Sequence, residues 1–368
     1  MDRSIFDRPV FAVHGIPVDA ISTTEACDKL LESIRTKSPC FFTTPNLNFL
    51  VACQADAEFR NSVIDSDLIV ADGMPLVRIA RLLDIQLPER VAGSSVFENL
   101  RRTLRSPCLS VFFFGGPNGI AKKANEVLNQ EHIGMTGAGA IYPGFGNLND
   151  MLAPAILSSI NESHADMLVV ALGAKRGQAW IQAAKIHLNA TVITHLGAVV
   201  NFVAGSVARA PLWVQRIGME WMWRIYQEPN LFKRYFSDGK AYIQILFKHV
   251  LPLKRAQKNH EREGENYLRN ECKLNVGIDR LTLIITGSAT SEILTLLRAN
   301  LKNVFDYPPM TVELDLKECT YFDAACLGQF MLLLKVQRNR GQPMLISNVN
   351  AKLDRLFELH AATYLLEQ

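Results

Sequence analysis

The sequence lacks the features that mark several common classes of protein. No apolar run approaches the roughly 20 residues that a membrane-spanning helix needs, and no basic and apolar leader precedes a small-residue cleavage site. The 7 cysteines include no Cys-x-x-Cys pair and the 8 histidines include no closely spaced pair, so no disulfide framework, metal site or cofactor is expected. Phosphate-loop and Gly-x-Ser-x-Gly motifs are also absent. These absences favour a cytoplasmic globular protein that is neither an NTPase nor a hydrolase of that kind.

The first part of the chain alternates apolar runs with helical patterns. With 368 residues, 48% of them hydrophobic, the chain has enough material for about two domains. Strands are predicted at 40–44, 68–71, 109–115, 167–173 and 191–197, and helices at 24–36, 45–56, 95–105, 119–130, 149–161 and 177–188. This order predicts an α/β fold with a mostly parallel sheet between helices.

A second α/β pattern follows a polar, charged stretch that is predicted to be a linker. Its strands are predicted at 281–286, 311–316 and 344–347, and its helices at 291–305, 326–340 and 351–360. The expected domains are a core at 1–203, a basic amphipathic appendage at 204–252, the linker at 253–270 and a small α/β domain at 271–368.

Basic and aromatic residues gather in the segment 205–258, which holds ten Lys or Arg against three Asp or Glu, although the whole chain has a net charge of only +3. A solvated helix face is one interpretation. The nearby Trp213, Trp221 and Trp223 favour the other, an anionic membrane surface, where each basic residue contributes on the order of 1 kcal/mol. We therefore expect a protein bound peripherally to the inner face of the cell membrane, with no nucleic-acid partner.

Short polar or glycine-rich segments follow several of the predicted strands, which is where open α/β sheets place their ligands. These segments are 43–50, 71–77, 87–95, 112–124 and 171–180. Any one of them, such as the glycine pair at Gly115 and Gly116, is equally well explained as a tight turn.

Taken together and in order, these segments resemble the WecG/TagA/CpsF family of bacterial glycosyltransferases. The resemblance continues through Arg209-Ala210-Pro211, Glu220-Trp221, Arg224, Glu228-Pro229 and Lys233-Arg234. It implies a metal-independent enzyme that transfers a hexosyl or N-acetylhexosaminyl group, with inversion, from a UDP-sugar to a polyprenyl-diphosphate-linked sugar. The product would be a precursor of an exopolysaccharide or another surface glycan.

The same resemblance assigns roles to individual residues. Asp72, after an apolar run and before Gly73, corresponds to the family's proposed general base, although an isolated Asp-Gly would more often be a turn or a cap. Thr44 and Asn46 correspond to positions lining the nucleotide-sugar pocket, and their alternative role is to cap the following helix. Arg90 either neutralises phosphate or pairs with Asp72.

Positive charge for the two diphosphates is expected from arginines of the appendage, because the guanidinium group binds phosphate oxygens in pairs. Arg224 and Arg234 are the best matches, whereas the alternative role of Arg209 is to stabilise the appendage. Asp65 and Asp67 resemble the metal-binding Asp-x-Asp motif of other glycosyltransferases, but they precede a strand, so surface capping is the better explanation.

The chain also departs from the family pattern. The usual glutamine is Gly177, and Gln178 can substitute for it only if the turn shifts by one residue. An expected carboxylate is the amide Asn201, and an expected arginine is Leu231. These changes indicate either an altered choice of sugar or acceptor, with Gln178 and Asn201 still binding substrate, or reduced activity.

Residues 271–368 resemble STAS domains, the fold of anti-sigma-factor antagonists. Their usual Asp-Ser-Ser-Gly is here Asp323-Ala324-Ala325-Cys326, which removes the hydroxyl that many relatives phosphorylate. We therefore expect a protein-docking or intramolecular role. The competing hypothesis for the whole chain is a catalytically weak regulatory or binding protein that uses this domain as its output.

Overall fold

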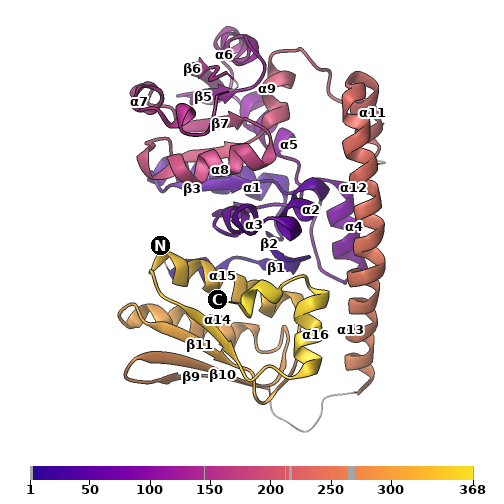
Figure 1. The fold of residues 1–368 in the computed structure, drawn as a ribbon. Coiled ribbons are helices and arrows are strands. Elements are labelled where there is room, and N and C mark those ends of the chain that lie inside the picture. Colours follow the sequence, from indigo (N-terminus) through magenta and orange to yellow (C-terminus); the bar gives the residue numbers. More distant parts are fainter. Residues whose placement is uncertain (1–2, 145, 212, 215–217, 264–269, 368) are drawn as a thin grey trace. The chain divides into compact units, whose positions relative to one another are not determined.

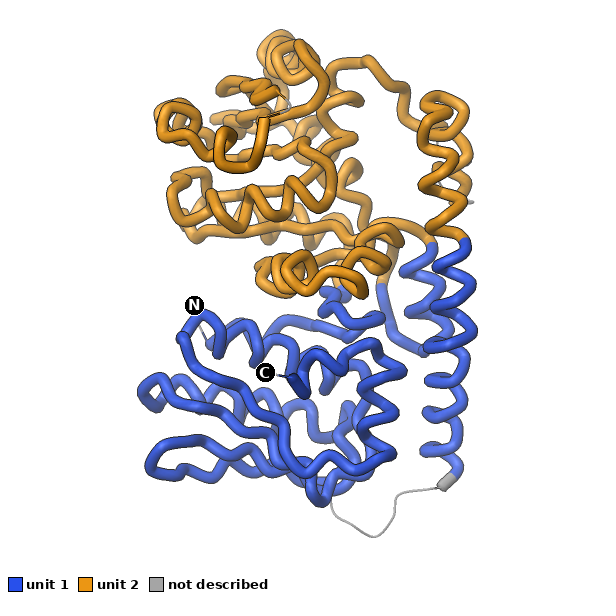
Figure 2. Tube along the Cα trace, in the orientation of Figure 1, with its two compact units in different colours: residues 1–20, 75–87, 240–368 blue, residues 21–74, 88–239 orange. Residues whose placement is uncertain are grey.

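The chain forms two compact units, each built from separate parts of the sequence (Figure 2). Unit 1 comprises residues 1–20, 75–87 and 240–368, and unit 2 comprises residues 21–74 and 88–239. The computed structural model describes residues 3–144, 146–211, 213–214, 218–263 and 270–367. The division therefore cuts across the order of the sequence, since both units contain residues from its N-terminal quarter.

Unit 2 is organised around a six-stranded sheet in which every pair of neighbouring strands is parallel (Figure 1). The strand order is β4-β3-β8-β7-β5-β6. The strands are β3 (Cys40–Thr43), β4 (Leu68–Ile69), β5 (Leu109–Gly115), β6 (Met135–Ile141), β7 (Met167–Ala171) and β8 (Val192–His195). The parallel α/β core predicted from the sequence is confirmed.

Helices cover both faces of this sheet. One face packs on α1 (Thr23–Thr36), α5 (Gly93–Arg102), α6 (Ile120–Glu131) and α9 (Gly197–Val203), and the other on α7 (Pro154–Glu162) and α8 (Ala174–Ala184). Two further helices, α2 (Leu47–Ala55) and α3 (Ala57–Ile64), connect β3 to β4, and α11 (Glu220–Gln227) belongs to the C-terminal part of the unit. Trp180 on α8 is fully buried and stacks on Phe114 of β5, with ring centroids 4.3 Å apart.

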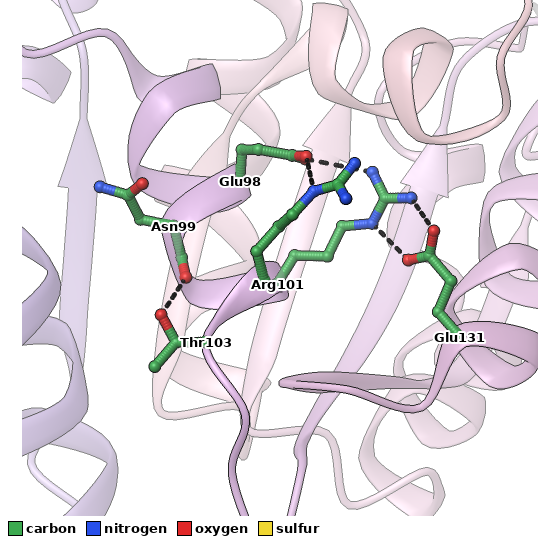
Figure 3. Close-up of polar contacts among 6 residues, drawn as sticks. Glu98, Asn99, Arg101, Thr103 and Glu131 are labelled. Atoms are coloured by element: carbon green, nitrogen blue, oxygen red, sulfur yellow. Dashed lines mark hydrogen bonds and ion pairs between the residues drawn. The ribbon is translucent and has the colours of Figure 1, made fainter.

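Ion pairs fix α5 against the end of α6 (Figure 3). Arg101 binds Glu131 through two contacts of 2.7 and 2.6 Å and also contacts Glu98 on its own helix at 3.1 Å. The end of α5 is closed by Thr103, whose hydroxyl donates to the Asn99 carbonyl at 2.7 Å. Because the Arg101 side chain is largely buried, these pairs are less screened than surface ones. They hold in place the helix whose first residue, Gly93, reaches the candidate site described below.

Unit 1 contains a five-stranded mixed sheet. Its strands are β9 (Glu271–Val276), β10 (Arg280–Ala289), β11 (Thr311–Asp315), β12 (Cys319–Phe322) and β13 (Met344–Ser347), in the order β12-β10-β11-β13, with β9 antiparallel to β10. Its helices include α14 (Leu294–Asn303), α15 (Ala324–Asn339), α16 (Ala351–Leu359), α4 (Met74–Leu82, from Pro75 on) and α13 (Leu251–Glu263). The predicted α/β pattern after residue 271 is thus present.

The N-terminal hairpin of β1 (Val10–Val13) and β2 (Ile16–Asp19) packs on α15 and belongs to the same unit. A Cβ added at Gly328 of α15 would lie only 2.9 Å from the Val10 carbonyl oxygen, so the two backbones approach closely where there is no side chain. At the turn of the hairpin, the Tyr364 hydroxyl donates to the Gly15 carbonyl at 3.0 Å. The C-terminal sheet therefore shares its core with the first residues of the chain.

The interval 253–270, expected to be a linker, is helical as far as Glu263. Helix α12 (Phe232–Ile245) continues through a π-helical turn (Leu246–Val250) into α13 without a break. The charged composition of α13 belongs to an amphipathic helix rather than to a linker, since Leu253 on the same helix is only 2% exposed. Among the described residues, no helix has the length and apolar character needed to cross a membrane.

A prediction concerns His360, which follows α16 and is 2% exposed. Neither ring nitrogen has a hydrogen-bond partner within the described part of the chain, and burial lowers the pKa of His360 to about 3. Below the ordinary histidine pKa of 6.5, the unfolded chain binds a proton at this residue that the folded chain does not. The free energy of unfolding therefore decreases as the pH falls, by about 1.4 kcal/mol per pH unit. His360→Leu should reduce this slope in urea unfolding between pH 6.5 and 4.

The matched control for this variant is His187→Leu, the same exchange at an exposed histidine of unit 2. If His360→Leu and the wild type lose stability equally steeply on acidification, His360 is not a source of the acid sensitivity.

Candidate active site

The carboxyl ends of β4, β3 and β8 lie side by side because these strands are neighbours in a parallel sheet. The chain leaves β3 and β8 toward opposite faces. Helix α9, after β8, shares a core with α1, α5 and α6, whereas α3, in the connection after β3, packs on α8. Neighbouring parallel strands whose connections diverge in this way mark the usual ligand site of open α/β sheets.

Asp72 lies at this edge, just after β4. The buried residues Val70 and Ala71 follow the strand, and the Asp72 N–H donates to the Pro45 carbonyl at 2.8 Å, beside the end of β3. Gly73 follows with φ 107°, a conformation that other residues rarely adopt. The backbone N–H of Gly93, at the start of α5, lowers the pKa of the Asp72 carboxyl.

Opposing electrostatic effects set the pKa of Asp72. Desolvation raises it most strongly, Arg90 lowers it, and the negative charge of Glu220 raises it again, with the pKa reaching about 6. The group is therefore mostly ionised at neutral pH and still basic enough to accept a proton. A general base works best when its pKa lies near the operating pH.

Arg90 and Glu220 form an ion pair beside Asp72, with Nη2 and Oε1 2.9 Å apart. The Arg90 side chain is 14% exposed, and this pair joins the segment before α5 to the start of α11. Arg90 was expected either to neutralise phosphate or to pair with Asp72. Its hydrogen-bond partner is Glu220, and its charge lowers the pKa of Asp72. Glu220 had no role in the sequence analysis beyond its place in the family motif.

Arg224, one turn further along α11, contributes a second cation near Asp72 and also lowers the pKa of that carboxyl. It forms a long ion pair of 3.8 Å with Glu228, and its Nε atom has no hydrogen-bond partner in the described part of the chain. The guanidinium group therefore has donors left for a ligand.

Thr44 lies against the other side of this cluster. A Cβ added at Gly93 would be 3.0 Å from the Thr44 hydroxyl oxygen and 2.3 Å from Leu196, which follows β8. Only glycine fits at the start of α5 without displacing these neighbours. The fold thus brings together four of the residues expected from the sequence, namely Asp72, Thr44, Arg90 and Arg224. Gly93 and Glu220 lie with them.

Asn46 caps α2, because its side-chain oxygen accepts from the Phe49 N–H at 3.3 Å. This is the alternative role that the sequence left open for it. Asn48 lowers the pKa of Asp238, a buried residue of α12 whose pKa is raised overall by burial. These two asparagines therefore organise the chain next to Thr44.

Gln178 is fully buried between α8 and the sheet. Its amide nitrogen donates to the Thr43 hydroxyl at 3.3 Å, and Thr43 in turn pairs with Ser66 at 2.7 Å. The structure thus places Gln178 in the layer beneath the strand ends.

Gly177 lies directly against His195, the last residue of β8. A Cβ at position 177 would be 2.2 Å from His195 Cδ2 and 2.9 Å from its Nε2. The imidazole therefore fills the space that a side chain at 177 would need. Burial lowers the pKa of His195 to about 4, so the ring is neutral at physiological pH, and Nε2 is buried with no partner among the described residues. The feature of the sequence that could have indicated this residue is a histidine at the end of the short strand Val192–His195.

The remaining candidates lie in other elements. Asn201 is on α9, where its carbonyl accepts from the Ser206 N–H at 3.1 Å. Arg234 is exposed on α12, with its guanidinium carbon 5.0 Å from the centre of the Tyr235 ring. Arg209 donates to the Ser95 hydroxyl at 2.7 Å, which ties the appendage to α5 in the way expected of a stabilising residue.

The acidic pair before β4 is used structurally. The Asp67 carboxylate accepts from the Phe41 N–H at 2.9 Å, and Asp65 is the C-cap residue of α3. Within the described ranges, no group of three or more His, Cys, Asp or Glu side chains is arranged to hold a metal ion.

A parallel sheet with helices on both faces and polar residues at the carboxyl ends of its strands is the arrangement in which α/β enzymes bind their substrates. Residues 11–256 match the model of the glycosyl transferase WecG/TagA/CpsF family, and the chain belongs to this family. Residues 276–367 match a second model, described as Mlab, STAS domain, so the C-terminal sheet of unit 1 is a STAS domain.

Two curated relatives carry the same name, N-acetylglucosaminyldiphosphoundecaprenol N-acetyl-beta-D-mannosaminyltransferase. The protein of Bacillus subtilis (strain 168) is 26% identical over 235 residues, which cover 64% of this chain and 90% of the relative. The protein of Bacillus spizizenii is 26% identical over 209 residues, which cover 57% and 79%. The similarity to these relatives thus involves most of their length and about three fifths of this chain.

The contact between Gly177 and His195 leads to a prediction. Gly177→Gln should destabilise the protein by about 1–3 kcal/mol, because the new side chain overlaps the imidazole. Adding His195→Gly should recover much of this loss, with a coupling of about 0.5–3 kcal/mol in urea unfolding. Gly239→Gln on α12 is the matched control, since no atom lies within 4 Å of its added Cβ. Strictly additive effects at 177 and 195 would contradict the pairing.

Proposed function

We propose that the chain transfers an N-acetylhexosaminyl group, with N-acetylmannosamine as the first candidate, from a UDP-sugar to N-acetylglucosamine on polyprenyl diphosphate. The product would enter the synthesis of an exopolysaccharide or another surface glycan. The names of the two relatives support the sugar and the acceptor. The observation that carries the proposal is the recessed Asp72 carboxylate, with a pKa of about 6, beside two arginines.

In the proposed reaction, Asp72 accepts the proton of the acceptor hydroxyl as that oxygen attacks the anomeric carbon of the donor. The bond between this carbon and the UDP oxygen breaks on the opposite side, which inverts the anomeric centre. One proton moves to Asp72, and the pair of electrons leaves with UDP. A positioned base of this kind contributes about 10²–10⁴-fold to the rate.

Negative charge that develops on the leaving diphosphate requires cations. Arg90 and Arg224 are the available candidates near Asp72, because Arg90 uses only part of its five-donor guanidinium group for Glu220, and Arg224 Nε lacks a partner among the described residues. Arg234, exposed on α12, is proposed to contact the acceptor diphosphate. Charge stabilisation by arginine is consistent with transfer without added metal.

This mechanism predicts the behaviour of Asp72→Asn. Turnover should fall by about 10²-fold or more with donor binding nearly unchanged, because the amide keeps the shape but accepts no proton. In the wild type, kcat/KM should rise with pH through a midpoint near 6, since the carboxylate is the active form. The measurement is transfer of radiolabelled sugar from UDP-N-acetylmannosamine and other UDP-sugars to a short-chain polyprenyl-diphosphate N-acetylglucosamine, with and without EDTA.

Asp65→Asn, just upstream, is the matched control and should retain activity. If Asp72→Asn turns over like the wild type, Asp72 is not the base. If the wild type transfers sugar from none of the donors, a regulatory or binding role is favoured instead. The departures from the family pattern at Gly177, Asn201 and Leu231 would then be the expected cause of the lost activity.

Attachment to an anionic membrane surface is part of the proposal. Phe232, Phe236 and Ile243 are each more than half exposed and follow one another at helical spacing on α12, so they lie on the same face of that helix. Lys233 and Arg234 are exposed beside them, and Trp221 and Tyr226 are exposed on α11. Exposed aromatic residues with adjacent cations suit the headgroup region of a bilayer.

Cosedimentation with anionic vesicles tests this attachment. Binding should weaken as salt rises, should fall in Lys233→Ala/Arg234→Ala through lost charge, and should fall in Phe232→Ser/Phe236→Ser through lost apolar contact. Lys122→Ala/Lys123→Ala, which removes two exposed lysines of α6, is the control. Equal binding of the wild type to neutral and anionic vesicles would reject the electrostatic part.

A further inference from the structure

Two of the points at which the chain passes between its units flank the candidate catalytic residues. The first is at 74/75, two residues after Asp72, and the second at 87/88, two residues before Arg90. The intervening segment, which contains α4, is part of unit 1 together with the STAS domain. The sequence that carries Asp72 is therefore continuous with a helix that is packed in the other unit.

Helix α4 begins two residues after Asp72. Only Gly73 separates Asp72 from the start of the helix at Met74, and the side chain of Met74 lies against Gly218, where an added Cβ would be 2.6 Å from its Cγ. The helix buries Leu76, Val77 and Ile79 almost completely. A movement of this short, packed helix would be passed directly to the turn at Asp72.

Helix α13 holds the far end of this segment. Lys254 forms an ion pair with Asp84, and the Gln257 amide donates to the Leu83 carbonyl at 3.3 Å. Asp84 has φ 56°, the left-handed conformation that Asp and Asn tolerate better than most residues. These two contacts fix the residues that follow α4 to a single face of α13.

The STAS domain in turn holds α13. The His260 ring stacks on Tyr321 of β12, with centroids 4.0 Å apart and an interplanar angle of 13°. In the π-helical turn Leu246–Val250, which leads directly into α13, His249 Nδ1 lies 3.1 Å from the Glu358 carbonyl of α16. Contacts therefore run without interruption from the STAS domain through α13 to the end of α4.

We propose that Lys254 and Gln257 are positioning residues for Asp72, acting through α4, so that the STAS domain is part of the transferase rather than a separate output module. The proposal rests on the role of Asp72 given under the proposed function. The competing interpretation is that these contacts stabilise unit 1 alone. The two differ in kinetics, because a stabilising contact leaves the turnover of folded enzyme unchanged.

The test is Lys254→Glu/Gln257→Ala in the full chain, which places a like charge opposite Asp84 and removes the amide donor. We expect kcat to fall roughly 10- to 100-fold with little change in donor KM, because the base is displaced rather than the donor. The pH midpoint of kcat/KM should also move. Amide hydrogen exchange of peptides covering 71–74 should become faster, and this readout does not depend on activity.

Asp84→Asn, added to this variant, removes the repulsion and keeps a residue that tolerates the same φ, so it should recover part of kcat. Lys302→Glu is the matched control, since Lys302 pairs with Asp7 elsewhere in unit 1 at 2.5 Å. Unchanged kcat, pH midpoint and exchange in Lys254→Glu/Gln257→Ala would overturn the proposal, as would an equal loss of kcat in Lys302→Glu. If the wild type transfers no sugar, the proposed function fails, and exchange at 71–74 still decides the positioning role.

Discussion

The balance between desolvation of Asp72 and the positive charge of Arg90 is the constraint on which the site depends. Desolvation alone would keep the carboxyl protonated, and an unopposed arginine would make it too weak a base. Glu220 holds Arg90 at 2.9 Å and so tempers its effect on Asp72. The three side chains come from the end of β4, the segment before α5 and the start of α11, so the balance exists only when these segments are packed together.

The same requirement explains the architecture around the site. Arg101 fixes α5 to α6, and the N–H of Gly93 at the other end of α5 lowers the pKa of Asp72. On the C-terminal side of Asp72 the chain continues into α4, which from Pro75 on belongs to the same unit as the STAS domain. A carboxylate whose pKa depends on small changes in distance to Arg90 gains from having both of its flanking segments held by packed helices.

Much of the core could be predicted because buried parallel strands are continuous apolar runs, as 109–115 and 167–171 show. The strand β6 was missed because its Met135–Ile141 sequence is rich in glycine and alanine, and α4 was missed because Asp72, Gly73 and Pro75 indicate a turn. The charged α13 was mistaken for a linker because its buried side is narrow. Family motifs predicted Thr44, Asp72, Arg90 and Arg224 as candidates. The contacts of Glu220 and His195 could not be predicted, since they join distant segments of the chain.

In the STAS domain, the helix at which the usual serine is replaced packs against other parts of the same chain. Ala325 replaces the usual hydroxyl and is itself only 4% exposed at the start of α15, and most of that helix is buried. The N-terminal hairpin covers part of it, with backbone contact at Gly328 that any side chain would prevent. This part of α15 is therefore covered by the N-terminal hairpin of the same chain. Its polar residues Gln329 and Lys335, which would suit an exposed surface, are instead buried. These contacts support packing within its own chain, one of the two roles expected for this domain.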